Sequence, residues 1–281
     1  MNLFGNADVE FISSKDNALL KQIRLLQALG SKGQKQRLAH SQAVLEGVHL
    51  LQTWAGDPCL STVLTSAAGL ANPEILESLE RHLALCPQTR LVELDAALWD
   101  SISELANAPH FLGLVQLPDS VIKPMAKQFL LSGDVVILEG IQDAGNVGAI
   151  LRTVAATGVN TVVALRGCAH LWSSKVLRAG MGAHHQLTLY EDWTIADLMQ
   201  HLEAPLLITA AVAKTDLYAL QAQLKKPVAW VFGNEGHGVS DELRTQGQLV
   251  RIPLALGVES LNVATAAAVC LFETVRVRSS E

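Results

Sequence analysis

At residues 251–265 the chain reads RIPLALGVESLNVAT. The pattern predicts a short apolar strand, then a loop containing Gly257 that delivers Ser260 and Asn262 to the start of a strongly apolar helix. Unpaired backbone N–H groups and the positive end of the helix dipole face outward at a helix start, so this position suits an anionic group. Two other segments, around Asn146 and Glu235, have the same strand–polar loop–helix form, and together they indicate a ligand site.

The composition is typical of a compact globular protein, because 49% of the 281 residues are hydrophobic and only 17% are charged. No basic stretch followed by an apolar one opens the chain, and no apolar run reaches the roughly 18 residues of a membrane span. The cysteines are scattered without a C-x-x-C pair, which argues against a zinc site and a disulfide framework. We therefore expect a cytoplasmic protein that uses neither a membrane nor a metal.

Strands and helices alternate twice along the chain. The first alternation predicts a small α/β domain over residues 1–117, and the more polar residues 118–130 are the expected linker. From 131 to 281, continuous apolar strands separated by helices predict a parallel sheet covered on both faces. By these rules alone the second domain is an ordinary doubly wound α/β domain.

A basic stripe lies near the start of a chain whose net charge is −6. Between Ser13 and His40, six basic side chains accompany the single acid Asp16, for a local charge of +5. This pattern indicates either a phosphate-binding surface or a solvated helix face. The basic residues are Lys15, Lys21, Arg24, Lys32, Lys35 and Arg37.

The loop at residues 139–148 follows one of the predicted parallel strands, where ligands bind in open sheets. Gly145 and Gly148 permit tight turns and close approach by a ligand. Asn146 can cap the next helix, and Arg152 is spaced to share a helical face with Gly148. The alternative is that Asn146 is only a cap and Arg152 only a surface cation.

The loop at residues 231–240 has three glycines within six residues after an apolar strand. Its glycine order differs from the dinucleotide fingerprint, and it lacks the Lys-Ser/Thr pair of a P-loop. Glu235 either binds a substrate or accepts backbone hydrogen bonds within the turn. The histidines lack metal-ligand spacing, and no G-x-S-x-G elbow surrounds Ser260, so a metal site and a serine hydrolase are both disfavoured.

Together the three loops resemble the three motifs of the SpoU/TrmH-type RNA ribose 2′-O-methyltransferases of the knotted SPOUT superfamily. The matching strings are DAGNVGAILRT at 143–153, FGNEGHGVS at 232–240 and IPLALGVESLNVA at 252–264. The stretch SKVLRAGMGA at 174–183 is also similar to that family, as are residues 13–21 and the string VLEG at 44–47. Ala144 and Ser174 stand where the family often has proline.

The resemblance implies a deep trefoil knot in the C-terminal domain, S-adenosylmethionine as cofactor and a homodimer formed through that domain. It also implies an N-terminal RNA-binding domain and methylation of a ribose 2′-hydroxyl in structured RNA. Ribosomal RNA is preferred over transfer RNA, because the two-domain layout resembles the rRNA-directed members. The implied cofactor-binding residues are Gly233, Asn234, Gly236, Ile252, Leu254, Gly257 and Leu261.

The family places the residue matching Arg152 at the centre of the reaction, with Asn146, Glu235, Ser260 and Asn262 around it. A guanidinium stays protonated in almost any protein site, so we expect Arg152 to clamp an RNA phosphate rather than to act as a base. The expected RNA-binding residues are the six of the basic stripe and Arg178. A non-catalytic RNA-binding or ribosome-assembly protein is the alternative, whereas an oxidoreductase would need a dinucleotide loop after the first strand.

Overall fold

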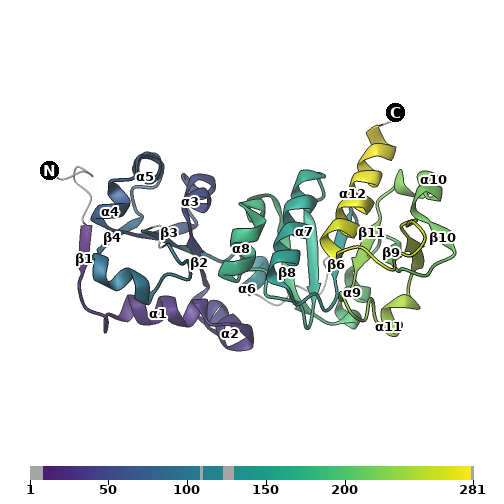
Figure 1. The fold of residues 1–281 in the computed structure, drawn as a ribbon, viewed down its shortest axis with the longest axis horizontal. Coiled ribbons are helices and arrows are strands. Elements are labelled where there is room, and N and C mark those ends of the chain that lie inside the picture. Colours follow the sequence, from purple (N-terminus) through teal and green to yellow (C-terminus); the bar gives the residue numbers. More distant parts are fainter. Residues whose placement is uncertain (1–8, 108–109, 123–129, 280–281) are drawn as a thin grey trace. The chain divides into compact units, whose positions relative to one another are not determined.

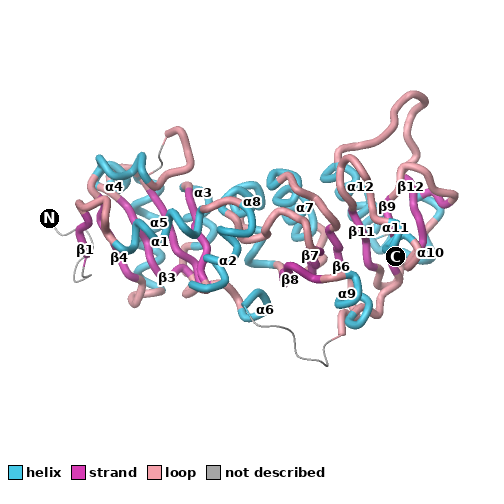
Figure 2. Tube along the Cα trace, turned by 90° about the horizontal axis from the view of Figure 1, so that it is seen from below, coloured by secondary structure: helices cyan, strands magenta, loops and turns pink. Residues whose placement is uncertain are grey.

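The computed structural model describes residues 9–107, 110–122 and 130–279. The chain forms two compact units (Figures 1 and 2). The first unit consists of Met1–Ile122 and Trp172–Gly182. The second unit consists of Lys123–Leu171 and Ala183–Glu281. The predicted domains, residues 1–117 and 131–281, differ from these two units in one segment, because residues 172–182 belong to the first unit. Of the predicted linker, Asp119–Ile122 form helix α6, and residues 123–129 lie outside the described part.

A five-stranded sheet forms the core of the first unit. In spatial order its strands are β1 (Val9–Ile12), β4 (Arg90–Leu94), β3 (Leu60–Thr65), β5 (Phe111–Gln116) and β2 (Gln42–Glu46). The first three run parallel to one another, while β5 is antiparallel to both of its neighbours. This α/β arrangement agrees with the alternation in the sequence, except that β1 was not predicted.

Helix α1 (Ala18–Gln27) covers this sheet with the apolar residues that its spacing predicts, among them Leu20 and Ile23. Helix α2 was not predicted, because its polar, glycine-containing sequence carries no apolar periodicity. Residues Ala96–Ser101 form a 3₁₀ helix, η1. Besides α6, the other helices of the unit are α2 (Gly30–His40), α3 (Val48–Trp54), α4 (Ala67–Leu70), α5 (Pro73–Leu85) and α8 (Ser174–Gly180).

A seven-stranded sheet forms the second unit, and every pair of neighbouring strands in it is parallel, as predicted. In spatial order the strands are β10 (Thr215–Asp216), β12 (Gln248–Arg251), β9 (Leu206–Thr209), β11 (Ala229–Phe232), β6 (Val135–Leu138), β7 (Thr161–Leu165) and β8 (Thr188–Trp193). Their residues are largely buried, because helices cover both faces of the sheet.

On one face of this sheet, Ile137 and Val231 share a buried cluster with Leu198 of α9 (Ile195–His201) and Leu243 of α11 (Asp241–Arg244). On the other face, Trp230 Nε1 donates a hydrogen bond of 3.1 Å to Thr274 of α12. There α7 (Ala144–Ala156) packs along α12 (Val263–Ser279), and the two lie side by side in Figure 1. The short helices are η2 (Ala183–Gln186), η3 (Leu217–Ala219) and α10 (Gln221–Leu224).

Parallel pairing places the three predicted loops at one edge of the second sheet. Strands β6 and β11 are adjacent and in register, with Leu138 opposite Phe232, so their carboxyl ends meet. Strand β12 ends at the same edge, beyond β9. The loops then enter α7, α11 and α12, respectively. Among the described residues, no helix has the length and apolar character that crossing a membrane requires.

Candidate functional site

Asn146 joins the three loops through hydrogen bonds of its side chain. Its amide nitrogen donates to Oε1 of Glu235 over 2.8 Å, and its amide oxygen accepts from Nδ2 of Asn262 over 3.0 Å. The three residues follow β6, β11 and β12, so one chain of hydrogen bonds connects segments 116 positions apart in sequence. The structure thus brings together three of the five predicted catalytic residues.

Asp143, and not Asn146, caps helix α7, which corrects one reading of the sequence. The Asp143 carboxylate accepts from the backbone N–H of Asn146 over 2.7 Å. The Asn146 side chain is therefore left to form the contacts with Glu235 and Asn262. An aspartate at the N-cap whose carboxylate accepts from the N–H of the third helical residue is an ordinary capping signal, and the sequence contained it.

Asn262 has two functions at the start of α12. Its side-chain oxygen accepts from the backbone N–H groups of Ala264 and Thr265, at 2.9 and 3.3 Å. Its side-chain nitrogen is the donor to Asn146. Capping fixes the rotamer of Asn262, and the fixed rotamer aims its nitrogen at α7.

The loop after β11 is a closed turn with Glu235 near its tip. Asn234 and Gly238 exchange two backbone hydrogen bonds of 3.1 and 2.9 Å. Gly238 has a positive φ of 70°, and a Cβ on Gly233 would lie 2.4 Å from the carbonyl carbon of Gly238. The turn therefore needs glycine at both positions.

The Asn234 side chain is used entirely within the protein. Its oxygen accepts from the backbone N–H groups of Gly236 and His237, at 2.8 and 3.1 Å. Its nitrogen donates to the carbonyl of Gly140 over 2.8 Å, which ties the turn to the loop after β6. The Asn234 backbone N–H is paired with Gly238 as well, so a ligand can still bond to Asn234 through the second lone pair of its carbonyl oxygen.

The loop from Ile252 to Leu261 is open and partly apolar. Within the described chain it forms one internal backbone hydrogen bond, from Val258 N–H to Ala255, so most of its amides and carbonyls are not used inside the loop. Gly257 has a φ of 87°, and Leu256 is fully exposed. The predicted cofactor residues Ile252, Leu254 and Leu261 are partly buried.

Arg152 and Ser260 are exposed, on α7 and in the last loop respectively. Among the residues that the structure describes, neither side chain takes part in a hydrogen bond or ion pair. Their contribution to the site thus stays a prediction. Cys168 follows β7, and its thiol donates to the Leu138 carbonyl over 3.2 Å. Burial raises the pKa of this thiol to about 11, so it is neutral and is not a nucleophile at this edge.

The predicted RNA-binding residues of the basic stripe fall into two groups. Lys15, Lys21, Lys32 and Lys35 are exposed, and Arg24 is partly exposed and bonds to Ser101. Arg37 is 3% exposed and donates to the carbonyl of Leu26 over 2.7 Å. Arg37 thus stabilises the contact between α1 and α2 and is not accessible to RNA, which corrects that prediction.

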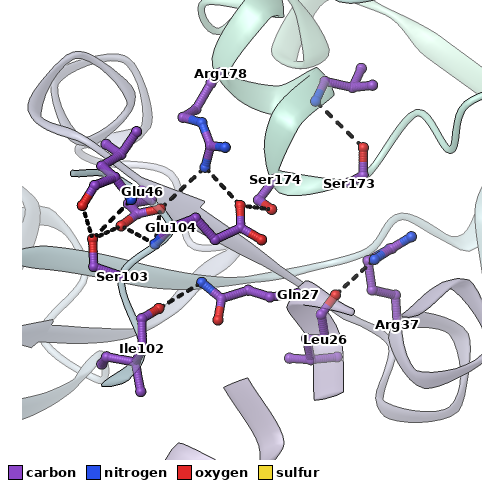
Figure 3. Close-up of polar contacts among 12 residues, drawn as sticks. Leu26, Gln27, Arg37, Glu46, Ile102, Ser103, Glu104, Ser173, Ser174 and Arg178 are labelled. Carbon is purple, nitrogen blue, oxygen red and sulfur yellow. Dashed lines mark hydrogen bonds and ion pairs between the residues drawn. The ribbon is translucent and has the colours of Figure 1, made fainter. Parts of the chain in front are cut away.

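Arg178 also differs from the prediction, because two carboxylates of the first unit hold its guanidinium (Figure 3). Nη1 lies 3.1 Å from Glu46 and 3.0 Å from Glu104, and Ser174 on the same helix donates to Glu104 over 2.7 Å. The Glu46 side chain is fully buried, and burial raises the pKa of its carboxyl. A buried carboxylate needs a counter-ion, and Arg178 supplies it.

Comparison with known proteins gives this site a context. Residues 134–272, which contain all three loops, match the SpoU rRNA Methylase family. An uncharacterized tRNA/rRNA methyltransferase of Synechocystis sp. is 31% identical over 280 residues, covering 96% of this chain and 95% of that protein. The chain belongs to the SpoU methylase family. This membership confirms the resemblance that the three motifs indicated.

Two further methyltransferases resemble this chain. The 23S rRNA (guanosine-2′-O-)-methyltransferase RlmB of Bordetella pertussis is 39% identical over 145 residues, which are 51% of this chain and 59% of RlmB. The AdoMet-bound rRNA methyltransferase of Sinorhizobium meliloti has the same fold, with a TM-score of 0.76 at 23% identity, over 95% of this chain and 98% of that one. The α/β fold with a parallel sheet is therefore that of the SpoU enzymes.

Proposed function

We propose that this protein transfers a methyl group from S-adenosylmethionine to a ribose 2′-hydroxyl of structured RNA. The observation that carries the proposal is the hydrogen-bonded chain Glu235–Asn146–Asn262, which links the three family motifs at one sheet edge. RlmB, whose name states 2′-O-methylation of guanosine in 23S rRNA, matches the segment that contains these motifs. Ribosomal RNA is therefore the preferred substrate.

The residues at this edge fit S-adenosylmethionine. The loop of 252–261 offers backbone groups that are not used internally, together with partly buried apolar side chains for an adenine or methionine chain. Gly233 lets the backbone of Gly238 approach more closely than a side chain would allow, which keeps the β11 turn closed beside this loop. The residues that would hold the cofactor are Gly233, Asn234, Gly236, Ile252, Leu254, Gly257 and Leu261. The cofactor, when bound, supplies an electrophilic methyl group on a sulfonium.

The protein's own task is to align a hydroxyl and to manage one proton, because the sulfur leaves as a neutral group. Glu235 and Asn262 fix the orientation of the Asn146 amide. These three hydrogen-bonded side chains can therefore orient a ribose hydroxyl, together with Ser260. Arg152 clamps the neighbouring phosphate through two parallel N–H bonds. A phosphate oxygen or water then takes the hydroxyl proton.

The exposed lysines of the basic stripe, which are Lys15, Lys21, Lys32 and Lys35, are the proposed RNA contacts, together with Arg24. Structured RNA is recognised chiefly by shape and by phosphates, which suits a basic surface. We also propose the deep knot of the SPOUT fold in the second unit and a homodimer formed through it, as the family resemblance implies.

One experiment separates this function from that of a non-catalytic RNA-binding protein. Purified protein is incubated with S-adenosylmethionine labelled in its methyl group and with unmodified ribosomal or transfer RNA. Alkali-resistant label in ribose, with more label in ribosomal RNA, is the expected result. RNA binding without transfer would support the non-catalytic alternative, and label in a base would contradict the 2′-hydroxyl as acceptor.

A further inference from the structure

Glu139, the first residue after β6, is bonded to the far end of the turn that carries Glu235. Its two carboxylate oxygens accept from the backbone N–H of Ser240 over 2.8 Å and from the Ser240 hydroxyl over 2.6 Å. Ser240 is also the N-cap of α11, since its hydroxyl accepts from the Leu243 N–H over 3.4 Å. One carboxylate thus fixes both the end of the β11 turn and the start of the next helix.

The same two loops are joined a second time at the near end of the turn. Asn234, the second residue after β11, donates to the carbonyl of Gly140. Residues 139 and 140 therefore hold the turn at Ser240 and at Asn234, on either side of Glu235. Two attachment points on the β6 side fix both the position and the tilt of the turn.

From this geometry we infer that Glu139 is a positioning residue for the methyl-transfer site, acting through Ser240 on Glu235. The inference depends on the proposed function for its kinetic consequence. Without this pair of hydrogen bonds, the side-chain contact that remains between the loop after β6 and the two ends of the turn, among the described residues, is that of Asn234 with Gly140. The turn can then tilt, and the Glu235 carboxylate loses its fixed distance to Asn146.

The test compares Glu139→Ala with Glu139→Gln in the full chain. Glutamine keeps both contacts, because its oxygen can accept from the Ser240 N–H while its amide donates to the hydroxyl. We expect Glu139→Ala to lower kcat about tenfold, the effect of misplacing an aligned group, and Glu139→Gln to restore it. The KM for RNA should stay unchanged in both. Glu242→Ala, which removes an exposed carboxylate from the first turn of α11, is the matched control.

A second measurement does not depend on activity. The Gly238 amide, bonded to the Asn234 carbonyl, should exchange its hydrogen faster in Glu139→Ala and at the wild-type rate in Glu139→Gln. Equal exchange in Glu139→Ala and Glu242→Ala would overturn the inference, as would a Glu139→Gln variant as impaired as the alanine. A wild-type protein that transfers no methyl group would overturn the proposed function, and the exchange rates would still decide the role of Glu139.

Discussion

Arg178 and Glu46 form an ion pair of 3.1 Å although they are 132 positions apart in the sequence. Glu46 ends β2, and Arg178 lies on α8, inside the segment that matches the methylase family but in the first compact unit. Two strings that the sequence analysis singled out, at 44–47 and 174–183, thus contact each other. The pair explains why an acid and a base stand at these two positions.

Replacing Arg178 by methionine should destabilise the first unit by about 3 kcal/mol at neutral pH, because a buried carboxylate is left without its counter-ion. Since burial raises the pKa of Glu46 above 4.5, the folded state takes up a proton more readily than the unfolded state. The penalty should therefore shrink as the pH falls from 7 toward 4.5. Urea unfolding at pH 7 and at pH 4.5 measures this loss of stability, with Lys175→Met, at an exposed residue, as the control. A penalty independent of pH would contradict this account.

Asn146→Ala should reduce methyl transfer by about a hundredfold, the effect of losing an oriented polar group in a reaction centre. Asn146→Asp should be as damaging, because a carboxylate cannot donate to Glu235 and repels it. The thermal midpoint should change little in either variant, since the contacts are exposed. Methyl-transfer assays of both variants test this expectation, with Gln142→Ala, at an exposed residue, as the control. A wild-type rate in Asn146→Ala would refute a catalytic role for the hydrogen bonds that link Glu235, Asn146 and Asn262.

Arg152→Lys should lower turnover about tenfold, because an ammonium cannot form the two parallel bonds of a guanidinium to one phosphate. Binding of S-adenosylmethionine, measured by calorimetry, should be unaffected. Arg244→Lys on α11 is the matched conservative control. If Arg152→Lys keeps full turnover and RNA affinity, the bidentate clamp is wrong.

Gly233→Ala should abolish binding of S-adenosylmethionine, because the added Cβ would lie 2.4 Å from the Gly238 backbone and force the turn open. Gly133→Ala is the control, since no heavy atom beyond the chain neighbours lies within 4 Å of its added Cβ and the residue is outside the candidate site. Calorimetric titration of both variants measures the difference. Equal affinities in the two would show that the turn does not hold the cofactor.

The buried His184 should make the second unit less stable in mild acid. Burial lowers the pKa of its ring from 6.5 to about 4, and Nε2 lies 2.8 Å from the Leu171 carbonyl. A lowered folded-state pKa gives stability that is complete above 6.5 and is lost as the pH falls toward 4. We expect a loss of about 2 kcal/mol between pH 7 and pH 5 from this group.

His184→Gln should remove that part of the pH dependence, while His185→Gln, exposed and adjacent, should keep it. Free energies of unfolding in urea at the two pH values provide the measurement. Identical pH slopes in the wild type and in His184→Gln would rule the ring out as the cause.

The sequence by itself determined most of the elements and indicated the three loops of the candidate site. Continuous apolar runs predicted six of the seven strands of the second unit, because a strand buried on both faces must be apolar throughout. The two-residue strand β10 was not predicted. The apolar pattern missed α2, because the sequence of this helix is polar. Contacts such as the buried hydrogen bond from Arg37 to the Leu26 carbonyl hold it in place instead. The three motifs indicated the family, and their positions after strands placed Asn146, Glu235 and Asn262 at one edge.

Only the tertiary structure decided which partner each polar side chain takes. Asn146 was a candidate cap in the sequence, but Asp143 fills that position and leaves Asn146 to bridge two loops. Arg178 was a candidate RNA contact, but it forms an ion pair with the buried Glu46. Sequence patterns report burial and local geometry, which depend on near neighbours. Hydrogen bonds and ion pairs depend on distances between segments far apart along the chain, and those distances are set only when the sheets assemble.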